Sequence, residues 1–325
     1  MQAQSTILQV KNLKKYFPTA GGLLYAVDNV SFSIRKGETL GVVGESGCGK
    51  STLGRTILRL HEPTAGEVIF NGEDITKYSA HQMKKLRSQI QMIFQDPYSS
   101  LNPRMTVGQL IEMPLRLQHI YKPSQKKEMR SRVFELMDMV GLARRLINSY
   151  PHELDGGRRQ RIGVARALAP KPSLIVCDEP VSALDVSIQA QILNLMQDLQ
   201  AELNLTYIFI THDLSVIKHL SQNIAVMYLG QMVETAPSET LFKNPMHPYT
   251  KALLSAIPIP DPDLPMKRVV LHGELSSPIN VGPGCRFATR CIYAREECHS
   301  APMGLKELAP DHFVQCLRAS DAELN

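Results

Sequence analysis

The chain has 325 residues, of which 43% are hydrophobic and 21% charged, and its formal net charge is +5. A chain of this length has room for two domains and can bury a core without help from disulfides or metal. The mild positive charge suits an anionic ligand or membrane surface. Since no tract of Lys and Arg stands out, nucleic acid is not indicated as a partner.

The apolar runs are short. The stretch 224–229, for example, falls far below the roughly 20 residues that span a bilayer. The first residues are polar and lead into a strand-like run rather than a signal peptide. We therefore expect a cytosolic chain, so that any work on a membrane needs a separate spanning partner.

In chain order, short runs rich in strand formers come first, then a long helical region, then strands alternating with a helix. Strands are expected within 5–45, including 7–10, 31–34 and 39–43, and again at 173–177 and 207–210. Helices are expected over 51–60, within 100–168 including 126–140, and over 188–203. The alternation predicts an α/β domain with a largely parallel sheet. Pro258, Pro260, Pro262 and Pro265 mark an extended linker before a short cysteine-bearing tail.

Residues 44–51, Gly-Glu-Ser-Gly-Cys-Gly-Lys-Ser, match G-x-x-x-x-G-K-[ST] between a predicted strand and a predicted helix. Backbone N–H groups of such a loop can wrap phosphates, Lys50 can reach the β- and γ-phosphates, and Ser51 can ligate Mg²⁺. The alternative is a Gly-rich turn with a surface lysine. The expected nucleotide contacts are Gly44, Glu45, Ser46, Gly47, Cys48, Gly49, Lys50, Ser51 and Thr52.

Asp178 and Glu179 follow four apolar residues at the end of a predicted strand. Ligands of open α/β sheets bind at the carboxyl ends of the strands. Asp178 is therefore the candidate partner of Mg²⁺, and Glu179 the candidate base that polarises the attacking water. The alternative is a pair of solvated acids after a core strand.

Further residues resemble the motifs of the ABC ATPase family, in the family's order, over about residues 5–235. Gln95 is similar to the Q-loop glutamine, 154–158 (Leu-Asp-Gly-Gly-Arg) to the signature, 182–185 (Ser-Ala-Leu-Asp) to the D-loop and His212 to the switch histidine. Tyr16 is similar to the aromatic residue that stacks on adenine. The resemblance implies that Gln95 touches Mg²⁺ or the attacking water and that His212 bonds a γ-phosphate.

In that family the signature faces a nucleotide bound by another subunit, so Asp155, Gly156 and Gly157 are expected to face a partner's phosphate. The resemblance implies a RecA-like P-loop core over 1–95 and 170–238 and a helical signature subdomain over 96–169. A C-terminal extension covers 239–325.

The segments 44–55, 95–104, 178–187 and 244–250 make the chain similar to the ATPase subunits of oligopeptide, dipeptide and nickel importers, specifically to the second of their two ATPases. That implies ATP hydrolysis coupled to solute import at the cytoplasmic face of a bacterial membrane. It also implies a heterodimer with a second ATPase, two permease subunits and an extracytoplasmic binding protein. The competing interpretations are a soluble ABC ATPase of DNA repair or translation and an iron–sulfur redox protein with a regulatory cassette.

The signature departs from the family, which usually has serine and glutamine where this chain has Asp155 and Arg158. Asp is a good helix N-cap, so the substitution can be a tolerated cap. The other interpretation is electrostatic, because a carboxylate would lie near the partner's γ-phosphate.

The tail contains Cys285, Cys291, Cys298 and Cys316, separated by 5, 6 and 17 residues. Four thiolates suit a [4Fe–4S] cluster or Zn²⁺, although the paired C-x₂₋₄-C spacing of structural zinc is absent. Some importers of the resembled family carry an iron–sulfur cluster in this region. The cluster, zinc, and free or disulfide-bonded cysteines all remain open.

Overall fold

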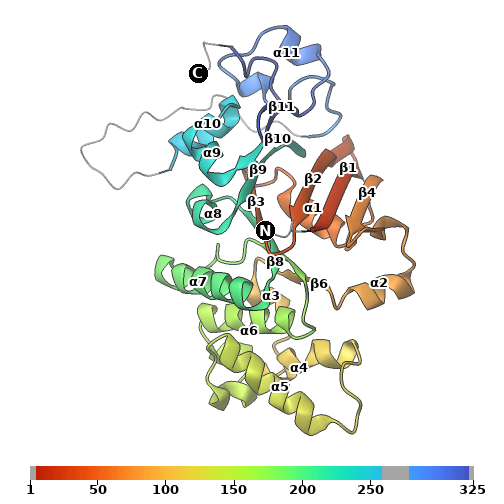
Figure 1. Ribbon diagram of the computed structural model, residues 1–325, viewed down its shortest axis with the longest axis vertical. Coiled ribbons are helices and arrows are strands. Elements are labelled where there is room, and N and C mark those ends of the chain that lie inside the picture. The colour runs from red at the N-terminus through yellow and green to blue at the C-terminus, as the bar shows by residue number, and fades with distance from the viewer. Residues whose placement is uncertain (1–4, 258–277, 322–325) are drawn as a thin grey trace, which may run out of the picture. The chain divides into compact units, whose positions relative to one another are not determined.

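The structure, a computed structural model, describes residues 5–257 and 278–321 and divides into two compact units (Figure 1). One unit comprises 5–7, 34–38 and 77–210, and the other comprises the remaining described residues. The proline-rich linker expected at 258–265 lies outside the described residues. None of the described helices is long and apolar enough to cross a membrane.

The unit that contains 77–210 is built on three parallel strands in the order β8 (Thr206–Thr211), β7 (Leu174–Asp178), β6 (Ile90–Ile93). Every residue of β7 and β8 is buried, as expected for parallel strands covered on both faces. The helices of this unit are α2 (Ala80–Leu86), α3 (Pro97–Ser100), α4 (Val107–Leu117), α5 (Lys126–Met139), α6 (Gly156–Leu168) and α7 (Val186–Leu203), with 3₁₀ turns η2 (Arg144–Asn148) and η3 (Pro151–Glu153). The helices predicted over 126–140 and 188–203 and the strand predicted over 173–177 are confirmed to within two residues.

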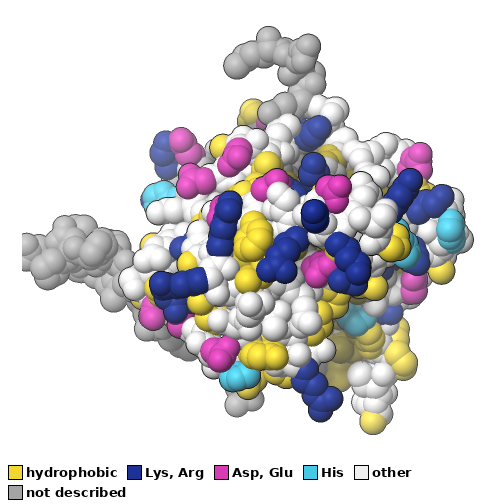
Figure 2. Space-filling view, turned by 90° about the horizontal axis from the view of Figure 1, so that it is seen from below, with side chains coloured by type: hydrophobic (Ala, Val, Ile, Leu, Met, Phe, Trp, Pro, Cys, Tyr) yellow, Lys and Arg dark blue, Asp and Glu magenta, His cyan; other side chains and the backbone are white. Residues whose placement is uncertain are grey.

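Helices α4 and α5 lie side by side (Figure 1) and bury apolar side chains such as Leu110 and Leu136. Their exposed charges pair locally, as between Arg116 and Glu112 at 2.7 Å. Figure 2 shows a face of the molecule on which Lys and Arg side chains are interspersed with Asp and Glu. Exposed pairs contribute at most about 1 kcal/mol each, so burial of the apolar side chains holds these helices together.

The other unit holds two sheets. In one, β3 (Thr39–Val43) pairs in parallel with β9 (Asn223–Tyr228), and antiparallel strands β10 (Gln231–Pro237), β12 (His312–Val314) and β11 (Lys306–Ala309) follow in that order. The second sheet has the order β2 (Gly22–Arg35), β1 (Thr6–Thr19), β4 (Ala65–Phe70), β5 (Glu73–Asp74). Its antiparallel pairs, β1 with β4 and β4 with β5, add to the parallel sheet that the sequence predicted. The helices are α1 (Lys50–Ile57), α8 (Leu214–Leu220), α9 (Ser238–Lys243), α10 (Pro248–Ser255) and α11 (Glu297–Ser300), with 3₁₀ turns η1 (Ile75–Lys77) and η4 (Ala288–Arg290).

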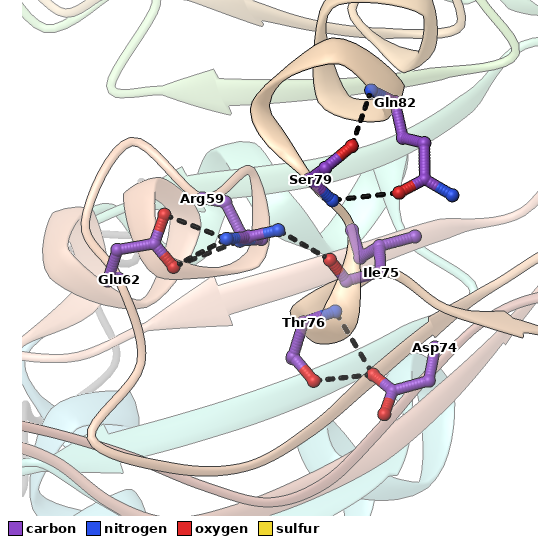
Figure 3. A network of polar contacts seen from close by, with 7 residues as sticks. All are labelled: Arg59, Glu62, Asp74, Ile75, Thr76, Ser79 and Gln82. Atoms are coloured by element: carbon purple, nitrogen blue, oxygen red, sulfur yellow. Dashed lines mark hydrogen bonds and ion pairs between the residues drawn. The ribbon is translucent and has the colours of Figure 1, made fainter.

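Helix α1 ends at Ile57, three residues before the predicted end at position 60. Arg59 has a positive φ of 49°, which turns the chain out of the helix. Its guanidinium donates to the Glu62 carboxylate at 3.0 Å and to the Ile75 carbonyl oxygen at 2.9 Å (Figure 3). Asp74 caps the next turn by accepting from the hydroxyl of Thr76 at 2.7 Å. The turn is therefore set by contacts that helix propensity does not reveal.

Two helix starts in the unit that contains 77–210 follow the same local sequence rule. Ser79 and Gln82 form a capping box at α2 (Figure 3), and Thr106 and Gln109 form another at α4. In each box the two residues satisfy one another's otherwise unpaired backbone N–H groups.

A buried carboxylate binds three parts of the C-terminal region together. Glu234 on β10 is fully buried and accepts from the backbone N–H groups of Met246 at 2.7 Å and His247 at 2.9 Å. The imidazole of His312 on β12 lies 2.7 Å from the same carboxylate. Burial raises the pKa of Glu234, but the hydrogen bonds outweigh it and the pKa lies below its usual value.

We predict that Glu234→Ala loosens 244–250 and β12, because the substitution leaves the buried His312 and the N–H groups of Met246 and His247 without their acceptor. Breaking a buried pair in this way costs about 3–5 kcal/mol. Hydrogen exchange of the β12 amides should accelerate strongly. The control Glu239→Ala removes a carboxylate that is 88% exposed and should leave exchange unchanged. Equal protection in both variants would contradict the role of Glu234.

Candidate functional site

The loop between β3 and α1 closes around a lysine side chain. Lys50 is the first residue of α1 and is only 4% exposed. Its ammonium donates to the carbonyl oxygens of Gly44 at 2.7 Å and Glu45 at 3.0 Å. A cation held at a helix N-terminus inside a Gly-rich loop is an arrangement that binds phosphate. Ser51 and Thr52, in the first turn of α1, are half-buried.

Two glycines of this loop allow a close backbone approach that no other residue permits. A Cβ atom at Gly44 would lie 2.2 Å from the carbonyl oxygen of Met227, and one at Gly49 would lie 2.0 Å from that of Ala26. Gly49 also has a φ of 105°, in the left-handed region. Cys48 between them is buried, and burial is the main reason that its pKa is raised. Ser46 and Gly47, in contrast, are exposed at the tip of the loop.

Tyr16, the expected adenine-stacking residue, lies on β1 and is half-buried. Its hydroxyl donates to Asp28 at 2.5 Å, and its ring centre lies 4.4 Å from that of Tyr25. Burial and the hydrogen bond to Asp28 raise its pKa. The side chain is thus a neutral aromatic in a fixed orientation.

In the unit that contains 77–210, the structure brings together two of the expected catalytic residues. Asp178 ends β7 and is fully buried, and Glu179 follows it with a positive φ of 46°. The Gln95 amide donates to the Glu179 carboxylate at 2.9 Å, across 84 positions in the sequence. The Glu179 N–H donates to the carbonyl oxygen of Ile210 at 2.9 Å and so ties the strained residue to β8. His212, in the other unit, is exposed just after β8.

The signature residues begin helix α6. Asp155 is its N-cap and accepts from the Arg158 N–H at 2.8 Å, while the Arg158 guanidinium lies 3.4 Å from the same carboxylate. A Cβ atom at Gly156 would lie 3.0 Å from Leu184, and one at Gly157 would lie 2.7 Å from Ile188. The two glycines therefore allow the start of α6 to pack against Leu184, just before α7, and Ile188, in its first turn.

The four tail cysteines line one small cavity of about 20 Å³, together with Phe287 and others. The Cys285 N–H donates to the Cys298 carbonyl oxygen at 2.7 Å. Burial, with smaller contributions from the other three thiols, raises the pKa of Cys285 to about 11. Among residues 5–257 and 278–321, however, no group of three or more His, Cys, Asp or Glu side chains is placed to hold a metal ion.

Residues of the C-terminal region that no sequence motif predicted contact the phosphate loop and β2. Arg286 binds Asp28, and Arg290 binds Glu45 at 2.9 Å across 245 positions. The Tyr249 hydroxyl accepts from the Glu45 N–H at 2.9 Å. The only local signal was an arginine placed directly beside each of two cysteines.

A strand–loop–helix phosphate site, an acidic pair after a buried strand and a glycine-led signature helix define a P-loop ATPase of the cassette type. Models of two families match the chain: ABC transporter over residues 27–182, and oligopeptide/dipeptide transporter, C-terminal region, over residues 233–298. The chain is 52% identical to the oligopeptide transport ATP-binding protein AppF of Bacillus subtilis, covering 96% of this chain and 97% of that protein. It is 49% identical to a putative peptide import ATP-binding protein of Brucella ovis, covering 97% and 98%.

Solved structures of ATP-binding cassettes also match this chain. A dimeric ATP-binding cassette in a post-hydrolysis state with ADP and Pi matches with a TM-score of 0.66 and 31% identity, covering 71% of this chain and 99% of that one. The cbiO1 protein of Clostridium perfringens, part of an ABC transporter complex, matches with a TM-score of 0.65 and 28% identity, covering 74% and 92%. This protein belongs to the family of ABC transporter ATP-binding proteins.

We predict that Asp155 contributes to stability as a helix cap. Asp155→Ala should cost about 1 kcal/mol, whereas Asp155→Ser should be close to neutral because serine caps equally well. Urea unfolding of the purified chain measures both. Arg158→Gln is the control for the exposed ion pair and should cost less than 0.5 kcal/mol, within the range of a surface substitution. If Asp155→Ala is as stable as the wild type, the capping role is wrong.

Proposed function

We propose that the chain is the ATP-hydrolysing subunit of an importer for peptides or related small solutes such as nickel. The observation that carries the proposal is the Lys50 ammonium enclosed by carbonyl oxygens of the phosphate loop. The match of 233–298 to an oligopeptide/dipeptide transporter region and the names of the relatives support the class of solute. A role in DNA repair or translation is not favoured, because these matches are to transport proteins.

Within this proposal, the loop residues 44–52 bind the phosphates of ATP and Tyr16 stacks on adenine. Lys50 contacts the β- and γ-phosphates. Ser51 and Gln95 are the side chains that would hold Mg²⁺, with Asp178 as a further partner, and the ion would neutralise charge on the phosphates. Hydroxyl, amide and carboxylate oxygens are donors that Mg²⁺ prefers, so the residues present fit the ion.

We assign the hydrolysis of ATP to Glu179 and its neighbours. The Glu179 carboxylate accepts a proton from the attacking water, and the hydrogen bond from Gln95 orients that carboxylate. His212 donates to the γ-phosphate as negative charge develops on it. Glu179 has a positive φ of 46°, and the hydrogen bond from its N–H to the Ile210 carbonyl oxygen on β8 maintains this backbone conformation.

Assembly with a second, related ATPase completes the proposal, with two permease subunits, an extracytoplasmic binding protein and a place at the cytoplasmic face of the membrane. Asp155, Gly156 and Gly157 would face the nucleotide held by the partner. Two like unit charges at 4 Å repel by about 4 kcal/mol at an effective dielectric near 20, and the Arg158 guanidinium 3.4 Å from Asp155 offsets part of this. We therefore expect one strong and one weak ATP site.

The test uses the assembled complex in vesicles, with the partner's own hydrolytic site silenced. Wild-type ATP hydrolysis should rise when peptide-loaded binding protein is added. Lys50→Ala should lose nucleotide binding. Glu179→Gln should bind ATP but turn over about 10²- to 10⁴-fold more slowly, because it lacks the base.

The control Glu239→Gln changes an exposed carboxylate and should behave as the wild type. A Glu179→Gln complex with the wild-type rate would disprove the role of this carboxylate. A rate of ATP hydrolysis that does not change when peptide-loaded binding protein is added would disprove the coupling to import.

We also propose that Cys285, Cys291, Cys298 and Cys316 bind one [4Fe–4S] cluster with a structural role. The support is that all four thiols line one cavity, and four thiolates are the usual ligands of such a cluster. A cavity of about 20 Å³ holds roughly one water molecule, so the surrounding loops must open to admit the cluster.

Anaerobically purified protein should then be brown and contain about four irons per chain. Cys291→Ser should abolish the colour and increase cleavage of the tail by proteases, while ATP binding persists. Cys177→Ser is the matched control, because that buried cysteine lies on β7 and should not affect iron content. One zinc and no iron in the anaerobic protein would overturn the cluster in favour of a zinc site.

A further inference from the structure

The phosphate loop is bound by an arginine from the far end of the chain. Arg290 donates to the Glu45 carboxylate at 2.9 Å and to the Tyr228 hydroxyl at 3.5 Å. The side chains of Arg290 and Glu45 are 9% and 23% exposed, so solvent screens the pair only in part. Glu45 is the second residue of the loop, and its carbonyl oxygen is one of the two that hold the Lys50 ammonium.

Glu45 is also bound through its backbone. Its N–H donates to the hydroxyl of Tyr249 on α10 at 2.9 Å. The C-terminal region therefore contacts both the side chain and the main chain of one loop residue, while the carbonyl oxygen of that residue holds Lys50. A change in the Arg290 contact would move the loop that wraps the phosphates.

A second arginine, four positions earlier, reaches the adenine side. Arg286 forms an ion pair with Asp28 and donates to the Leu229 carbonyl oxygen. The other oxygen of the Asp28 carboxylate accepts from the Tyr16 hydroxyl at 2.5 Å. Side-chain exposure is 5% for Arg286 and 15% for Asp28. The orientation of the Tyr16 ring thus depends on an arginine from beyond position 280.

Packing fixes the segment that carries both arginines. Phe287 lies between them in sequence, is 2% exposed, and packs against Tyr228 and Tyr249 with ring centres 5.3 and 5.4 Å apart. A 3₁₀ turn, Ala288–Arg290, follows. With Phe287 buried as the anchor, the two guanidinium groups have little freedom to leave their partners.

We propose that Arg290 and Arg286 are positioning residues of the nucleotide site: Arg290 holds the phosphate loop through Glu45, and Arg286 holds Tyr16 through Asp28. The proposal rests on ATP binding at Lys50. The C-terminal region is then a structural part of the nucleotide site. Arg290 acts at the phosphates of the nucleotide, and Arg286 acts at its adenine base.

The experiment compares binding of ATP and of inorganic tripolyphosphate, which has no base, to the full-length chain. Arg290→Met keeps the aliphatic stem and removes the hydrogen bonds to Glu45. The substitution should weaken the binding of both ligands about tenfold, since the free energy of a lost charged hydrogen bond corresponds to about that factor in affinity. Arg290→Lys retains a cation and should lose less affinity for both ligands than Arg290→Met does.

Arg286→Met should weaken the binding of ATP about tenfold and leave the binding of tripolyphosphate unchanged, because the substitution disturbs only the stacking residue. The matched control is Arg295→Met, in the same tail, whose partner is Asp321 and whose side chain is 53% exposed. It should bind both ligands as the wild type does. A general loss of folding would weaken both ligands in every variant, so the split between the two arginines distinguishes positioning from stability.

A double-mutant cycle keeps the proposal testable even if Arg290→Met melts at a lower temperature. Glu45→Gln should reproduce the Arg290→Met effect, and the double variant should be no weaker than either single variant. Additive effects, or ATP and tripolyphosphate binding within twofold of the wild type in both arginine variants, would overturn the inference. A wild-type chain that does not bind ATP would instead refute the proposed function.

Discussion

The candidate nucleotide site depends on the close approach of the phosphate loop to two backbone carbonyl groups. Gly44 packs against the carbonyl of Met227 and Gly49 against that of Ala26, at distances where a Cβ atom cannot fit. Positions 44 and 49 must therefore be glycine for the loop to lie this close to Met227 on β9 and Ala26 on β2. Once it does, its carbonyl oxygens enclose the Lys50 ammonium.

The C-terminal region is built onto the same framework. Strand β9 leads through Leu229 and Gly230 into β10, and the Gly230 N–H donates to the Cys48 carbonyl oxygen in the phosphate loop at 2.8 Å. Further along β10, Glu234 binds the start of α10 and β12. The antiparallel pair β9–β10, which has a register shift between Met232 and Glu234, thus contacts the phosphate loop at one end and the tail at the other.

In the unit that contains 77–210, individual hydrogen bonds and helix caps fix the expected functional residues. Its expected base, Glu179, is strained in backbone conformation and is maintained by hydrogen bonds to Gln95 and to β8. Its signature helix begins at a charged cap, and Gly157 allows that start to pack against Ile188. Here side-chain caps account for the starts of α2, α4 and α6, while the strain at Glu179 is supported by contacts with Gln95 and with Ile210 on β8.

The sequence by itself determined the phosphate loop, the acidic pair after a buried strand, the helices over 126–140 and 188–203 and the family, because short motifs and periodicity encode these directly. Only the tertiary structure decided the antiparallel second sheet, the early end of α1 at Ile57 and the gathering of four cysteines around one cavity. The Asp155 cap of α6 was one of the two interpretations that the sequence offered, and the structure shows it. The partnership of Glu45 with Arg290 spans 245 positions and leaves no periodic or motif signal, since it joins a loop and a 3₁₀ turn that only the folded chain brings together.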